Sequence, residues 1–206
     1  MKRALARRLS AVDGFRNPDV ELEQYATSPA LAANIVHLAD LEGDLDAPVL
    51  DLGTGTGMLA IAAACRTPPR VVGIDIDADA LAIARENEAT VDPPTGVEWV
   101  QGNASDPPIR LRRATVLMNP PFGAQHGARG ADREFLDAAR AHASVTYSVH
   151  NAGSRSFIES YAADHDGSVT HAFAAEFPVD AQFEFHRTDR AVLDVEVFRV
   201  EWPTYS

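Results

Sequence analysis

Apolar runs and helical periodicity alternate along most of this chain. Short continuous apolar runs predict strands buried on both faces, whereas apolar positions three or four residues apart predict amphipathic helices. We expect seven strands, at residues 49–52, 71–76, 97–101, 115–118, 144–149, 169–177 and 191–200. We expect helices between them at residues 60–64, 79–88, 132–142 and 154–163, and two earlier ones at residues 4–12 and 29–40.

The last two expected strands differ from the others because only a polar loop, residues 180–190, separates them. Long strands joined in this way predict an antiparallel pair. The sequence therefore predicts an α/β fold: a doubly wound, Rossmann-like sheet of seven strands with a reversed C-terminal β-hairpin. We interpret residues 1–45 as an N-terminal helical segment and residues 46–206 as the core of the same domain, since no linker or repeat separates them.

Composition narrows the class of protein. The chain has 206 residues, with 30 acidic against 18 basic side chains and a net charge of -12, and Lys2 is its only lysine. Such a composition favours adaptation to high salt, where ions screen the repulsion between carboxylates, and an acidic mesophilic protein is the alternative. No apolar run reaches the ~20 residues of a membrane span and no secretory signal is present, so we expect a cytoplasmic protein. The sequence has no cluster of residues at metal-ligand spacing, so we expect no metal site.

The first expected strand runs into a glycine-rich turn, Asp51-Leu52-Gly53-Thr54-Gly55-Thr56-Gly57. Glycines at a strand-to-helix turn let the backbone approach a ligand closely. The dinucleotide fingerprint would need a third glycine where this chain has Met58. The pattern instead resembles the S-adenosylmethionine turn of doubly wound methyltransferases.

Polar residues also end the next two expected strands. Asp75 lies about 20 residues after the glycines, where a carboxylate can accept both hydroxyls of a ribose, and a helix cap is the alternative. Asp77 and Asp79 are expected to cap the following helix. Asn103 follows the third strand and is a candidate donor to an adenine, with a simple turn residue as the alternative.

The most specific motif follows the fourth expected strand: Asn119-Pro120-Pro121-Phe122. An amino nitrogen on an aromatic ring is a poor nucleophile, because its lone pair is delocalised into the ring. The Asn119 side-chain oxygen and the Pro120 carbonyl can accept its two N–H bonds, and Phe122 can stack on the base. The motif predicts methylation of a planar amino nitrogen, and an ordinary proline-rich turn is the alternative.

Together these motifs resemble those of the small archaeal and eukaryotic N6-adenine ribosomal-RNA methyltransferases, the methyltransferase-like protein 5 family. The resemblance extends to residues 12–15, 22–27, 147–150 and 185–186. It implies transfer of a methyl group from S-adenosylmethionine to N6 of an adenine in small-subunit ribosomal RNA, with residues 119–122 holding the base. It also implies a cofactor site lined by Gln24, Tyr25, Thr27, Asp51, Gly53, Gly55, Thr56, Met58, Asp75, Ile76, Asn103 and Ala104.

The resemblance also implies partners. Ribosomal RNA is the implied substrate, and a small zinc-binding activator protein is the implied subunit of a heterodimer, added to the edge of the strand at 97–101. Some relatives carry lysine where this chain has Asn151, and the loop after His186 is less basic here. Candidate RNA contacts are Arg3, Arg7, Arg8, Arg129 and Arg133.

Other functions use the same chemistry. Methylation of a protein glutamine, of guanine N2 or of adenine in DNA also presents a planar nitrogen. The glutamine enzymes typically carry tyrosine where this chain has Phe122, and the DNA enzymes usually add a target-recognition domain. A cofactor-binding RNA scaffold without turnover is an alternative of a different class.

Overall fold

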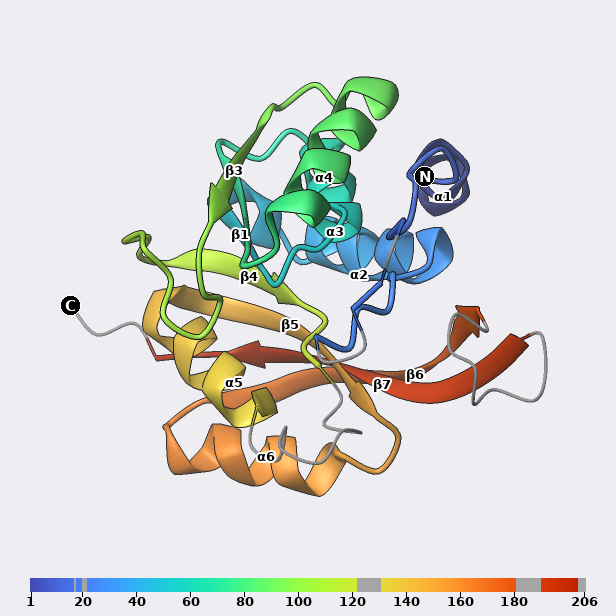
Figure 1. Ribbon diagram of the computed structural model, residues 1–206. Helices are drawn as coiled ribbons and strands as arrows, with labels where there is room; N and C mark the ends of the chain where they lie inside the picture. Colours follow the sequence, from blue (N-terminus) through green and yellow to red (C-terminus); the bar gives the residue numbers. More distant parts are fainter. Residues whose placement is uncertain (17, 20–21, 122–130, 181–189, 204–206) are drawn as a thin grey trace.

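A computed structural model gives the fold and describes the chain except for residues 17, 20–21, 122–130, 181–189 and 204–206 (Figure 1). The strands are β1 Val49–Leu52, β2 Val71–Asp75, β3 Val97–Gln101, β4 Ala114–Met118, β5 Ala143–Asn151, β6 Ser168–Asp180 and β7 Arg190–Glu201. The helices are α1 Lys2–Leu9, α2 Pro29–Leu41, α3 Met58–Ala64, α4 Ala78–Val91, α5 Ala131–His142 and α6 Arg155–Asp164, with a 3-10 turn η1 at Asp44–Asp46. None of the helices in the described ranges is long and apolar enough to cross a membrane.

The seven strands form one sheet in the order β3-β2-β1-β4-β5-β7-β6. The first five strands pair in parallel, and β7 lies antiparallel between β5 and β6. The predicted doubly wound sheet with a reversed C-terminal hairpin is therefore confirmed. Predicted bounds differ from the observed ones by at most three residues; α1, for example, ends at Leu9 because residues 10–12 form a turn. The turn η1 was not predicted.

Two hydrophobic cores lie on opposite faces of the sheet. Adjacent strand residues point to opposite faces, so Val49 belongs to the core under α1, α2 and α3, whereas Leu50 belongs to the core under α5 and α6. Figure 1 shows α2 and α3 on one side of the central strands and α5 and α6 on the other. Burial on both faces explains why the central strands read as continuous apolar runs.

The N-terminal segment is tied to the sheet by buried polar contacts. Arg199 on β7 holds the carboxylate of Asp44 in η1 with two hydrogen bonds, of 2.8 and 2.9 Å. The Tyr147 hydroxyl on β5 donates a third, of 2.5 Å, to the same carboxylate. Such bidentate, charge-assisted bonds are directional, so they fix where the N-terminal helices meet the sheet.

Candidate active site

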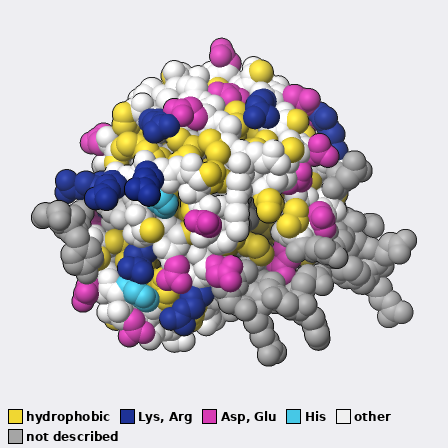
Figure 2. Space-filling model, turned by 60° about the vertical axis from the view of Figure 1, so that its left-hand side comes forward, with side chains coloured by type: hydrophobic (Ala, Val, Ile, Leu, Met, Phe, Trp, Pro, Cys, Tyr) yellow, Lys and Arg dark blue, Asp and Glu magenta, His cyan; other side chains and the backbone are white. Residues whose placement is uncertain are grey.

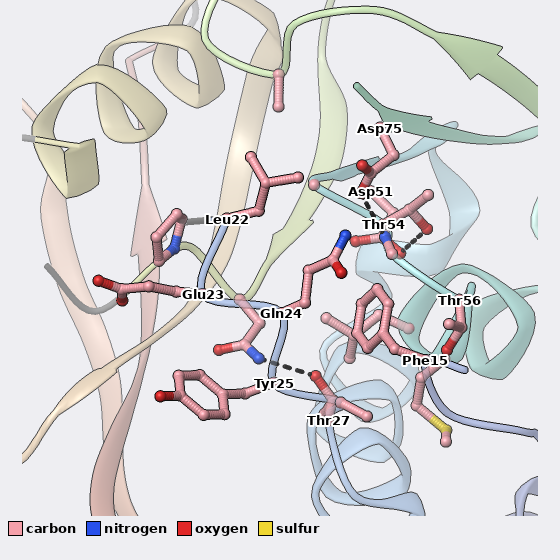
Figure 3. A pocket seen from close by; sticks show the side chains of 18 of the residues that line it. Phe15, Leu22, Glu23, Gln24, Tyr25, Thr27, Asp51, Thr54, Thr56 and Asp75 are labelled. Carbon is pink, nitrogen blue, oxygen red and sulfur yellow. Dashed lines mark hydrogen bonds between the residues drawn. The ribbon is translucent and has the colours of Figure 1, made fainter. Parts of the chain in front are cut away.

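A cavity of about 300 Å³ lies where the carboxyl ends of the central strands meet, which is where open α/β sheets bind ligands. Figure 3 looks into it. The lining residues come from the N-terminal segment, the glycine turn, the ends of β2, β3 and β4, and α5. They are Phe15, Leu22, Glu23, Gln24, Tyr25, Ala26, Thr27, Asp51, Gly53, Thr54, Gly55, Thr56, Met58, Leu59, Asp75, Ile76, Asn103, Ala104, Asn119, Pro121 and Phe135.

The glycine turn needs its glycines for conformation and for space. Gly53, Gly55 and Gly57 have φ values of 68°, 55° and 90°, a region that side chains rarely adopt. A Cβ added to Gly55 would lie 2.8 Å from the ring of Phe15, so that ring packs directly on the turn. Asn87 on α4 supports this contact, since its side chain bonds the backbone of Asp13 and the Thr56 carbonyl. This gives the motif at residues 12–15 a structural role beside the cavity.

Asp51 places a buried carboxylate against the turn. Its Oδ2 accepts hydrogen bonds from the Thr54 hydroxyl (2.6 Å) and the Ala60 amide (2.9 Å). Its Oδ1 is buried and has no partner among the described residues. Burial raises the pKa of this carboxyl to about 7; the two hydrogen bonds oppose the rise and the nearby charge of Asp75 adds to it. The free oxygen suits the cationic group of a ligand.

The structure excludes one of the two roles that the sequence left open for Asp75, the cap of the following helix. The Asp77 side chain accepts from the Asp79 amide at the start of α4, so Asp77, and not Asp75, caps that helix. Asp75 instead accepts from the Gly55 amide (2.7 Å) and the Asp77 amide (2.9 Å). Burial raises the pKa of Asp75 although these bonds favour its charged form. Next to it, the apolar side chain of Ile76 is 56 % exposed.

A strap, residues 22–27, crosses the cavity between the ends of β2 and β4. The Gln24 amide donates to the Asp77 carboxylate (2.7 Å), and its oxygen accepts from the Asp19 amide (2.8 Å). Figure 3 shows Gln24 directed toward Asp51 and Asp75, whereas the Tyr25 ring points the other way. Side chains on both sides of the strap backbone therefore line the cavity.

Asn119 lies where the strap and β4 meet. Its Nδ2 donates to the Thr27 hydroxyl (3.1 Å), the bond drawn at Thr27 in Figure 3. Its Oδ1 is buried and has no partner among the described residues. Pro121 lines the cavity, whereas Pro120 is buried and is not among the lining residues. Phe122 lies outside the described residues.

Every residue predicted for the cofactor site lines this cavity. Asn103 keeps both of its predicted roles open: its Oδ1 forms a turn with Ser105, and the residue borders the cavity. Seven lining residues were not predicted from the sequence: Phe15, Leu22, Glu23, Ala26, Thr54, Leu59 and Phe135. The motif at 12–15 was the signal for Phe15; nothing in the pattern signalled Phe135, which reaches the cavity from α5.

His150, the described histidine of the resembling motifs, lies away from the cavity. His150 is 2 % exposed, does not line the cavity, and its Nε2 has no partner among the described residues. Burial lowers its pKa to about 4, so it is neutral near pH 7. His186 lies outside the described residues, and across the described ranges there is no group of three or more potential metal ligands.

Comparison with known protein families identifies the class of protein to which the chain belongs. The family model for the methyltransferase small domain matches residues 32–145. Taken with the doubly wound sheet and the cavity at its carboxyl edge, this match defines a methyltransferase.

Relatives that match over most of both chains identify the family within the methyltransferases. The chain is 35% identical over 212 residues to the rRNA N(6)-adenosine-methyltransferase Mettl5 of Drosophila melanogaster, covering 97% of this chain and 95% of the relative. It is 34% identical over 199 residues to METTL5 of Danio rerio, covering 93% and 94%. A solved structure from Pyrococcus horikoshii, assigned to the RNA methyltransferases, superposes with a TM-score of 0.88 at 34% identity over 98% of both chains. The chain belongs to the METTL5 family of rRNA N6-adenosine-methyltransferases, which confirms the resemblance drawn from its motifs.

Proposed function

We propose that this protein transfers a methyl group from S-adenosylmethionine to N6 of an adenine in small-subunit ribosomal RNA, in the cytoplasm. The observation that carries the proposal is the buried Oδ1 of Asn119 beside the glycine-turn cavity, which has no hydrogen-bond partner among the residues that the structure describes. A buried acceptor without a partner is costly, and an amino group of a substrate would satisfy it.

The cavity residues fit S-adenosylmethionine. Asp51 Oδ1, which no described residue bonds, suits its ammonium group. The Asp75 carboxylate at the end of β2 suits its ribose hydroxyls, and the exposed Ile76 side chain suits its adenine ring. Bound there, the cofactor supplies an activated methyl group. The tight turn at Gly55 leaves backbone at the cavity wall, so the ligand can approach closely.

The protein then has to position the acceptor nitrogen. Asn119 Oδ1 and the Pro120 carbonyl can accept the two N–H bonds of the adenine amino group, which favours a pyramidal nitrogen whose lone pair points into the cavity. Phe122 can stack on the base. No strong base is required, because the proton leaves after transfer, when the nitrogen has become cationic.

We also propose an activator subunit at the edge of β3. The support is topological: among the strands that the structure describes, β3 pairs with β2 alone and forms one edge of the sheet, so it can accept an added strand. Hydrogen exchange at residues 97–101 tests this. Adding the zinc-binding partner should protect these backbone amides, and unchanged exchange would contradict a strand addition here.

Methyl transfer to RNA tests the activity. RNA from a strain lacking the gene would be incubated with labelled cofactor and the activator in molar salt, then digested to nucleosides that are identified by mass. Wild type should produce N6-methyladenosine and Asn119→Ala should not. Cofactor binding without any methylated nucleoside would reject the RNA-adenine activity and favour a protein glutamine substrate or a scaffold.

A further inference from the structure

We propose that the connection between β3 and β4 carries the surface that binds the phosphate backbone of the RNA. Its arginine segment, residues 110–113, consists of Arg110, Leu111, Arg112 and Arg113. The three arginine side chains are exposed and the leucine is buried. This inference rests on the proposed function, since it assigns the RNA of that reaction to a surface that the sequence motifs did not single out.

Acidic residues are missing from the sequence around this segment. The whole chain has 30 acidic residues in 206, about one in seven, yet residues 107–131 contain none. Phosphates are repelled by carboxylates and attracted by arginines, so an acidic protein needs such a stretch to hold RNA. In Figure 1 the β3–β4 connection lies at the left, the side that Figure 2 brings forward, and there Lys and Arg side chains gather beside a histidine.

The three arginines are also free to take phosphates. Other arginines of the chain are engaged with acidic side chains, namely Arg16, Arg66, Arg70, Arg155 and Arg199. Within the described residues, Arg110, Arg112 and Arg113 form no ion pair. Guanidinium groups bind phosphate oxygens through paired N–H donors, so unpaired arginines are ready ligands for a phosphodiester backbone.

The segment is held rigidly. Leu111 is 9% exposed and packs in the core under α5 and α6, and its carbonyl lies 2.9 Å from His142 Nδ1 at the end of α5. The Ser144 hydroxyl donates to the Arg113 carbonyl (3.3 Å), and Arg113 has a φ of 60°, which is uncommon for a residue with a side chain. A backbone fixed before binding loses less entropy when the ligand is bound.

Strand β4 sets the distance between this segment and the proposed catalytic motif. Arg113 immediately precedes β4 and Asn119 immediately follows it. Six steps along a strand span roughly 20 Å, and every residue of β4 is buried, so the spacing is fixed. One RNA that touches both sites must extend over that distance. The segment should therefore favour extended or folded RNA and contribute nothing to a trinucleotide.

Two of the arginines that the sequence indicated as RNA contacts already have other contacts, and two more provide a control. Arg8 donates to the carbonyls of Val91 and Asp92, and Arg133 lies over the Tyr161 ring at 5.7 Å. Arg129 lies outside the described residues. Lys2, Arg3 and Arg7 are exposed on α1, and their replacement provides a control with the same change in net charge.

Two triple variants test the proposal: Arg110→Gln/Arg112→Gln/Arg113→Gln, and the control Lys2→Gln/Arg3→Gln/Arg7→Gln. Each is measured for binding to ribosomal RNA over a range of salt concentrations, with cofactor binding as the check on folding. The segment variant should bind RNA at least tenfold more weakly than the control at low salt. Its log–log salt slope should fall by about three, roughly one for each phosphate that the variant no longer neutralises.

The length of the RNA provides a second readout. Binding and methylation of a trinucleotide that contains the target adenosine should be the same for wild type and the segment variant. Equal loss in both triple variants, or unchanged RNA binding in the segment variant, would overturn the proposal. RNA binding is measured without methyl transfer, so a wild type that binds RNA through the segment but methylates none of it would reject only the proposed activity.

Discussion

The side-chain amide of Asn119 donates a hydrogen bond to the hydroxyl of Thr27, 3.1 Å away and 92 residues earlier in the chain. An amide has a donor end and an acceptor end. Thr27 accepts from the donor end and so fixes the direction of the amide, and no described residue bonds the acceptor end beside the cavity. Thr27, predicted from the family resemblance to touch the cofactor, thus also contacts the residue proposed to hold the target base.

Removing this hydroxyl should slow the reaction. In Thr27→Val the partly buried Nδ2 of Asn119 loses its partner, at a cost of about 1–3 kcal/mol, and the amide loses its fixed direction. We expect kcat for RNA methylation to fall by about ten- to a hundredfold, whereas Thr27→Ser should keep most of it. Cofactor affinity, measured separately by calorimetry, shows how much of the loss lies in cofactor binding. A Thr27→Ser enzyme as slow as Thr27→Val would exclude the hydroxyl as the cause.

Asp51→Asn should raise the stability of the folded protein and weaken its binding of the cofactor. The pKa of Asp51 is raised to about 7 from an ordinary 3.8, so the unfolded carboxyl ionises first as pH rises. The folded protein therefore loses stability between about pH 4 and pH 7, by up to about 4 kcal/mol. Asparagine cannot ionise, so the variant should unfold at higher temperature than wild type at pH 8, while binding S-adenosylmethionine more weakly.

Asp164→Asn is the matched control, because Asp164 is exposed at the end of α6. It should alter neither the unfolding temperature nor cofactor binding. If Asp51→Asn is less stable than wild type at pH 8, burial of the ionised carboxylate does not destabilise the folded protein.

His150 should make the protein sensitive to mild acid. Its pKa is lowered to about 4 by burial, so between pH 6.5 and pH 4 the unfolded state takes up a proton that the folded state refuses. Stability is lost as pH falls through that window, by about 2 kcal/mol at pH 5. His150→Leu should lose less stability than wild type between pH 7 and pH 5 in urea unfolding. The partly exposed His171→Gln should behave like wild type. A His150→Leu protein that also behaves like wild type would contradict the prediction.

The acidic composition should make stability depend on salt. With a net charge of -12, the carboxylates repel one another until ions screen them. We propose that the N-terminal helical segment (1–45) and the core (46–206) unfold as one unit. We therefore expect a single transition, followed by circular dichroism, whose Tm rises between about 0.1 M and about 2 M KCl. A Tm that stays constant or falls would count against adaptation to high salt, and two transitions would count against one domain.

Local patterns were enough to predict much of this fold. The central strands are buried on both faces, so their apolar runs are continuous, and glycines and prolines mark where they end. The long strands β6 and β7 were predicted as a pair because only a short polar loop separates them. The turn η1 was missed because it is fixed by Arg199 and Tyr147, residues more than a hundred positions away.

The sequence by itself determined the sheet, the glycine turn and the Asn-Pro-Pro motif, because each depends on short-range patterns of apolar residues, glycine and proline. The tertiary structure brought Phe15 and Phe135 to the cavity beside them, from segments far away in the chain. Only the tertiary structure decided which ends of the polar side chains are bonded. Thr27 bonds Asn119 Nδ2, and Thr54 and Ala60 bond Asp51 Oδ2. Within the described part of the chain, the Oδ1 atoms of Asn119 and Asp51 have no partner. The structure also decided that Arg110, Arg112 and Arg113 have no acidic partner among the described residues, since ion pairs depend on contacts between distant parts of the chain.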